Sequence, residues 1–159
     1  GRNYITQCIG CLLNGDIQGL HTLSSSLHHA IADRKLDIRD FSRVEVLKDS
    51  LQKYTTDVDA GKRNRSAAYE VALTSSKLVR PGDRIAYYVT GHDANVRTFE
   101  HCKSSEEWDP NFPDQNGLYY IRRLDEFSEK FKPFFLPQDF EPSFLPMISL
   151  HSPHTALLP

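Results

Sequence analysis

The feature that most constrains the fold is a stripe of large apolar residues in the last third of the sequence. Its members recur at alternating steps of four and three, a spacing that places them on one face of a helix. They are Tyr120, Leu124, Phe127, Phe131 and Phe134. Pro137 ends the pattern, because proline lacks the backbone N–H that a helix interior requires. We therefore predict a helix that begins near Leu118 and ends before Pro137.

Three earlier segments carry the spacing expected of helices. Apolar residues recur at helical steps over residues 5–13 and 20–31, and residues 66–76 predict a helix with small side chains on one side. Asp16 is placed to cap the second of these helices, which we expect to end near Asp33. Helix is therefore the predominant predicted structure.

Two short segments have the composition of strands. Residues 85–89 combine aromatic and β-branched side chains and form the clearest strand, and residues 44–47 predict a second one. Residues 57–64 mix charge with glycine and indicate a loop, whereas residues 100–116 read as irregular. Residues 37–42 read as a short helical turn or a loop. We predict an α+β fold, mainly helical, with a few short antiparallel strands.

Length and charge limit the organisation and the function. A chain of 159 residues is long enough for one domain with its own core. We assign residues 1–136 to that domain and residues 137–159, which are rich in proline, to an extended C-terminal tail. The formal net charge is −2, so binding to nucleic acid would require a local basic patch.

The sequence also indicates a compartment. It contains no apolar run of about 18 residues, so we expect no transmembrane helix, and no signal sequence opens it. Its three cysteines are an odd number, which argues against a secreted disulfide framework and favours a reducing compartment. We expect a cytoplasmic protein without a membrane partner. Because the chain opens on Gly1 rather than Met, we also expect an excised or processed region.

Two pairs of residues have the spacing of redox or metal sites. Cys8 and Cys11 could form half of a zinc or redox site, but no second ligand pair follows and both lie within a helical pattern. We interpret them as a buried helix face. His28 and His29 fall at the end of a predicted helix, where histidine cations interact favourably with the helix dipole.

Two carboxylates support a metal-dependent alternative. Asp57 and Asp59 could share a metal ion at Asp-x-Asp spacing, as paired carboxylates do in phosphoryl transfer. This spacing leaves open a small metal-dependent nuclease. The sequence contains no glycine-rich phosphate loop and no Gly-x-Ser-x-Gly motif. Our preferred interpretation therefore assigns no catalytic residue and no metal ligand.

A basic cluster precedes the helix that begins near Ser66. Basic side chains and the free N–H groups of that helix would point at the same place, which favours binding of phosphate. The candidate binding residues are Lys53, Tyr54, Lys62, Arg63, Asn64 and Arg65.

Five segments in order resemble the C-terminal thumb region of family B DNA polymerases, with the greatest similarity to the bacterial DNA polymerase II branch. The similarity extends from Leu20 to Phe135. A turn after a helix is matched by residues 32–37, and a short strand followed by Leu and Tyr by residues 44–54. A basic loop and an Ala-rich helix are matched by residues 63–72, a Gly-Asp-x-Ile-x-Tyr-Val strand by residues 82–89, and a Tyr-Tyr-Ile helix by residues 119–135.

The resemblance implies a thumb-like fold that grips the backbone of a primer–template duplex without reading its sequence and so supports processive synthesis. Lys and Arg would hold phosphates, and Tyr54 would pack on or hydrogen-bond to the backbone. The family's Pro-His pair is missing and the loop is longer, so the contact residues differ from the family pattern.

Further partners and a location follow from the same resemblance. The partners would be the remaining polymerase domains and a sliding clamp, and the location would be nucleoid-associated cytoplasm. The palm carboxylates that hold Mg²⁺ in the parent enzyme are absent, so this region would need no cofactor and would be inactive alone.

A second functional class remains open. The chain could be a protein-interaction module that docks through the Pro-rich tail, residues 137–159. Some polymerases end in a clamp-binding peptide, but residues 155–159 of this chain match such a peptide poorly.

Overall fold

The computed structural model describes residues 2–134, which divide along the chain into two units. Within these residues, the helical unit consists of residues 2–36, 92–94 and 117–134, and the sheet unit consists of residues 37–91 and 95–116. The sheet unit is therefore inserted into the sequence of the helical unit. The tail predicted for residues 137–159 lies outside the described residues.

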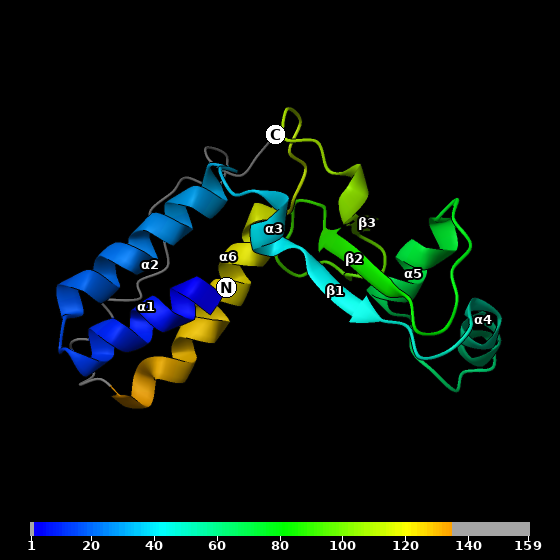
Figure 1. The fold of residues 1–159 in the computed structure, drawn as a ribbon, viewed down its shortest axis with the longest axis horizontal. Coiled ribbons are helices and arrows are strands. Elements are labelled where there is room, and N and C mark those ends of the chain that lie inside the picture. Colours follow the sequence, from blue (N-terminus) through cyan, green and yellow to red (C-terminus); the bar gives the residue numbers. More distant parts are fainter. Residues whose placement is uncertain (1, 135–159) are drawn as a thin grey trace. The chain divides into compact units, whose positions relative to one another are not determined.

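Four helices form the described part of the helical unit (Figure 1). They are α1 (Arg2–Leu13), α2 (Ile17–Ala32), α6 (Gly117–Ser128) and the 3₁₀ helix η2 (Glu129–Phe134). Both α1 and α6 pack against α2. Asp16 caps α2 as predicted, because its carboxylate accepts a hydrogen bond of 2.8 Å from the Gly19 N–H.

The apolar stripe of residues 120–134 supplies much of the core of this unit. Leu124 packs with Ile121 and the end of α2, and Phe131 packs with Leu20 and Cys8. The burial of Cys8 confirms that the first half of the cysteine pair lies on a buried helix face. The last member of the stripe, Phe134, is 73% exposed, because the α-helix ends at Ser128 and the chain continues as η2.

His28 is a buried polar residue that ties α2 to α6. Its Nδ1 lies 2.6 Å from the Ser24 carbonyl oxygen, and its Nε2 lies 2.6 Å from Oδ1 of Asp125. Both ring nitrogens therefore face oxygen atoms. Nδ1 donates its hydrogen to the Ser24 carbonyl oxygen, and a second hydrogen bond joins Nε2 to the Asp125 carboxyl group. The histidine pair lies near the end of α2 as predicted, and His28 in addition has a tertiary partner on another helix.

We predict that His28→Ala lowers the free energy of unfolding of the helical unit by about 3 kcal/mol, because it leaves Asp125 without its buried partner. The exposed neighbour His29→Ala is the control and should change it by no more than about 0.5 kcal/mol. Urea denaturation followed by circular dichroism measures both changes. Equal, small effects of the two substitutions would contradict a structural role for the His28–Asp125 pair.

The sheet unit contains three short strands, and short helices precede, separate and follow them along the chain (Figure 1). Its elements are α3 (Ile38–Phe41), β1 (Arg43–Val46), α4 (Leu51–Asp59), α5 (Ala67–Thr74), β2 (Arg84–Val89), β3 (Cys102–Ser104) and the 3₁₀ helix η1 (Ser105–Glu107).

The strands form an antiparallel sheet in the order β1-β2-β3. Residues that pair directly across two strands lie on the same face of a sheet, and Glu45 pairs with Ile85 while Tyr87 pairs with Ser104. Ile85 and Tyr87 pack toward α5 and α4 in the core of the unit. Tyr88 lies on the opposite face, where its ring centroid is 5.8 Å from that of Phe41.

These elements confirm the predicted α+β class with short antiparallel strands and correct two local predictions. Residues 51–59 form a helix that was not predicted, so residues 57–59 are helical rather than part of a loop. Residues 102–104 form a strand inside a segment expected to be irregular. None of the helices within residues 2–134 combines the length and apolar character needed to cross a membrane.

Candidate nucleic-acid interface

The basic loop that connects α4 to α5 spans residues 60–66, whereas a loop was predicted over residues 57–64, and Tyr54 holds it from inside. The Tyr54 side chain is 1% exposed, and its ring stacks on that of Tyr69 with the centroids 4.4 Å apart. Its hydroxyl accepts the Ser66 N–H at 3.0 Å and donates to Oε2 of Glu70 at 2.6 Å. Tyr54 therefore fixes the loop and the start of α5 and does not offer a surface for direct contact with DNA.

Arg63 also faces the interior of the sheet unit. Its Nη1 donates to Oδ2 of Asp49 at 3.0 Å, and its guanidinium lies over the ring of Tyr69 at 4.5 Å from the centroid. It also lies 5.2 Å from the centroid of Tyr54. The predicted phosphate contact at Arg63 would have to compete with Asp49 for a guanidinium on a side chain that is 28% exposed.

Arg65 is more exposed but has acidic partners. Its Nη2 donates to Oε1 of Glu70 at 2.9 Å, its Nη1 lies 3.7 Å from Oε1 of Glu100, and its guanidinium stacks on Phe99. Burial disfavours the charged form of Glu70, but the hydrogen bonds from Arg65 and Tyr54 outweigh it and hold the pKa of Glu70 below its ordinary value. Arg65 therefore stabilises the start of α5.

The predicted contact residues that the structure leaves exposed are Lys53, Lys62, Asn64 and Arg65, and of these Arg65 is paired with Glu70. Lys53 makes an ion pair of 3.3 Å with Asp57 one helical turn away, in which the Lys53 side chain is 58% exposed. Lys62 forms no ion pair with any residue of the described chain. Of the predicted set, Lys62 therefore presents the positive charge that is least compensated.

The metal-site alternative is not compatible with the position of its two carboxylates. Asp57 and Asp59 lie two residues apart in α4, and residues at this spacing point to different sides of a helix. Asp57 instead pairs with Lys53. Elsewhere in residues 2–134, no three His, Cys, Asp or Glu side chains come together in a way that could hold a metal ion.

Sequence reasoning missed three exposed cations at one end of the sheet. Lys48 follows β1, Arg80 lies in the turn before β2, and Arg84 opens β2. They are separated by up to about 36 positions in sequence, so no local pattern marks them, and only the pairing of β1 with β2 brings them to the same end.

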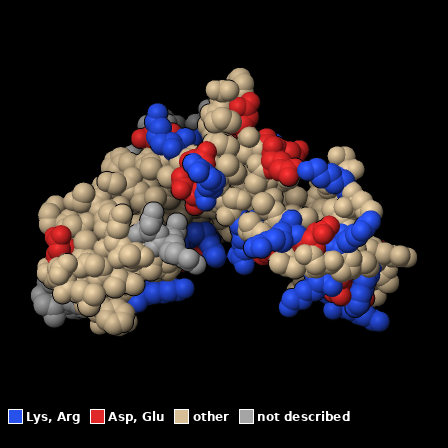
Figure 2. Space-filling view, viewed as in Figure 1, with Lys and Arg blue, Asp and Glu red and all other residues tan. Residues whose placement is uncertain are grey.

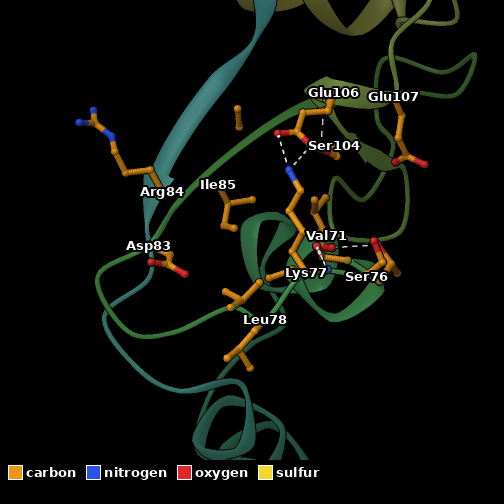
Figure 3. A pocket seen from close by; sticks show the side chains of 15 residues that line it. Val71, Ser76, Lys77, Leu78, Asp83, Arg84, Ile85, Ser104, Glu106 and Glu107 are labelled. Atoms are coloured by element: carbon orange, nitrogen blue, oxygen red, sulfur yellow. Dashed lines mark hydrogen bonds and ion pairs between the residues drawn. The ribbon is translucent and has the colours of Figure 1, made fainter.

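The sheet unit also contains a cavity of about 660 Å³ between α5, residues 75–79 and β2 (Figure 3). Lys77 extends across it to Glu106, with 3.2 Å between Nζ and Oε2. Arg84 is one of the lining residues, and the end of its labelled side chain extends away from Lys77 and Glu106. The polar groups that line the cavity are of mixed charge and do not converge on one position, so we assign no ligand to it.

No protein-family model matches the chain, and no curated protein matches it.

The lowered pKa of Glu70 predicts a pH dependence of stability. A carboxylate whose pKa is lower in the folded state adds stability above its ordinary pKa near 4.5, and this stability is lost as the pH falls through the lowered value. We expect wild-type protein to lose stability between pH 5 and about pH 3 in urea denaturation, and Glu70→Gln to lose less over the same range.

The matched control for Glu70 is Glu107→Gln, which alters an exposed carboxylate with no ion pair among the described residues. This variant should retain the full acid dependence. Asp114, whose pKa is also lowered although burial opposes the shift, should account for part of the dependence that remains in Glu70→Gln. An unchanged pH profile in Glu70→Gln would show that the Arg65–Glu70–Tyr54 contacts do not stabilise the folded state.

Proposed function

We propose that this chain grips the sugar-phosphate backbone of a primer–template duplex without reading its sequence, as the thumb of a family B DNA polymerase. The observation that carries the proposal is the loop of residues 60–66, which Tyr54 of α4 braces from inside. In this loop Arg63 and Arg65 are paired with carboxylates, while Lys62 and Asn64 face solvent. This role requires no catalytic group from this chain, and Mg²⁺ would be held by the palm of the parent enzyme.

The order of segments in the sequence supports the choice of DNA. Residues 44–54, 63–72 and 82–89, which resemble successive thumb segments, form β1 with α4, the loop with α5, and β2. These three pieces belong to one unit, and its core contains residues from each of them. A thumb-like role for the sheet unit is therefore consistent with where these three of the five matched segments lie. The other two, residues 32–37 and 119–135, belong mostly to the helical unit.

The kind of contact supports binding without sequence preference. Base-specific readout requires side chains that reach base edges, commonly through bidentate Arg, Asn or Gln contacts. The arginines of the loop are engaged by Asp49 and Glu70, so the accessible charge belongs to lysines, which bind phosphate as point charges. Such contacts position a protein on DNA and carry no sequence information.

We predict that the chain binds a labelled primer–template duplex with a Kd of roughly 10⁻⁴–10⁻⁶ M at physiological salt and more tightly at low salt, and that the affinity is the same for two unrelated sequences. Lys62→Gln should weaken binding several-fold and lower the slope of log K against log salt by about 0.9, the value for one phosphate contact. Fluorescence anisotropy over a salt series measures both quantities.

Lys77→Gln is the matched control, since it removes one positive charge from the same unit at a residue that is paired with Glu106. It should alter the salt slope less than Lys62→Gln does. Absence of binding at low salt, or equal effects of the two variants, would contradict the proposed role of the loop. The protein-docking alternative concerns residues 137–159, which lie outside the described residues, and no observation in the described part favours it.

A further inference from the structure

Lys48, Arg80 and Arg84 lie together at the end of the sheet where β1 finishes and β2 begins. Arg84 pairs with Val46, the last residue of β1. Beyond this pair, the Leu47 N–H donates to the Asp83 carbonyl at 2.9 Å, and the Gly82 N–H donates to the Leu47 carbonyl at 2.6 Å. These hydrogen bonds hold the turn that contains Arg80 beside the segment that contains Lys48.

The positive charges of these three residues are not neutralised within the described chain. All three side chains are exposed, and none forms an ion pair with a residue in positions 2–134. The nearest carboxylates in sequence have other partners. Asp83 accepts the backbone N–H of Arg80 at 2.9 Å, and Asp49 accepts from the Arg63 guanidinium.

The same end of the sheet is continuous with the basic loop. Asp49, which follows Lys48, binds Arg63 of the loop through its carboxylate and the Tyr69 hydroxyl through its backbone N–H, at 3.0 Å in each case. Residues 47–50 therefore run between the turn at residues 80–83 and the loop at residues 60–66. Lys and Arg side chains gather over this region, around α4 and the end of β1 (Figure 2).

We propose that Lys48, Arg80 and Arg84 form a second phosphate-binding row that extends the contact made by Lys62 along the backbone of the same nucleic acid. The inference rests on the function proposed above and adds to it residues that neither the sequence pattern nor the polymerase resemblance identifies. The ligand is a chain of phosphates and not a single anion, because the cations are exposed and come from separate segments of the chain.

One observation and one general argument favour a nucleic-acid backbone over an anionic lipid surface. The carboxylates of Asp49 and Asp83 stand next in sequence to Lys48 and Arg84, which suits separate phosphates spaced along a strand better than a continuous sheet of negative charge. Two anchored rows also multiply the release of counterions, which is the main source of affinity for duplex DNA.

The test compares two triple variants of the full chain by anisotropy with the same primer–template duplex. One variant is Lys48→Gln, Arg80→Gln and Arg84→Gln. The control is Lys77→Gln, Arg97→Gln and Lys103→Gln, which removes equal charge from residues paired with Glu106, Glu100 and Asp114. We expect the first to lower the salt slope by about 2.7, or 0.9 per lost phosphate contact, and the control to lower it by less than about 0.9.

A third variant separates charge from folding. Lys48→Arg, Arg80→Lys and Arg84→Lys keep the positive charges and should keep the wild-type slope, and a changed slope would overturn the inference. A wild-type slope in the Gln triple variant, with Lys62→Gln still weakening binding, would overturn the second row and leave the proposed function intact. If wild-type protein does not bind the duplex, both the second row and the proposed function are overturned. The same holds if it binds phosphatidylserine vesicles alone.

Discussion

The sheet unit depends on the two hydrogen bonds that the Tyr54 hydroxyl group makes. This hydroxyl group lies between two helices that are joined by a basic loop, and it satisfies groups on both sides of the junction. A buried hydroxyl without partners would cost about 1–3 kcal/mol, and here it instead binds the backbone N–H of Ser66, the residue before α5, and the carboxylate of Glu70. The orientation of α4 relative to α5 and the course of residues 60–66 follow from this one side chain and its stack on Tyr69.

Because internal side chains hold the loop of residues 60–66, they determine which of its charged side chains a ligand can reach. Arg63 covers the stacked tyrosine rings and binds Asp49, and Arg65 binds Glu70, so both arginines stabilise the fold. Lys62 and Asn64 are left on the surface of a loop that is already ordered. A ligand that binds there would lose less to the ordering of the protein than one that binds a flexible basic segment.

The sequence predicted those parts of the fold that have strong local signals. The periodic apolar residues of α2 and α6, the Asp16 cap and the β-rich segment of β2 all produce the expected elements. The helix α4 was missed because it has nine residues, several of them polar or β-branched, and its one fully buried side chain, Tyr54, gives no periodic pattern. Its stability comes from tertiary contacts, which local sequence does not reveal.

The candidate site was predictable in position but not in the role of each residue. The run from Lys62 to Arg65 is contiguous, so its location before α5 could be inferred. Arg63 binds Asp49, which is 14 positions away, and Arg65 contacts Glu100, which is 35 positions away, in addition to Glu70. The cations at the end of the sheet converge only through the β1–β2 register. Roles that depend on such distant pairs cannot be derived from a single sequence.

The central claim is that the outward face of a Tyr54-braced loop contacts nucleic acid, and NMR titration of ¹⁵N-labelled protein with duplex DNA tests it most directly. The account predicts that amide shifts of Lys62, Asn64 and their neighbours change on addition of DNA, in the same way for two unrelated sequences. The Ser66 amide, held by Tyr54, should remain protected from hydrogen exchange in the free and bound states. Shift changes confined to the helical unit, or different for each sequence, would contradict the account.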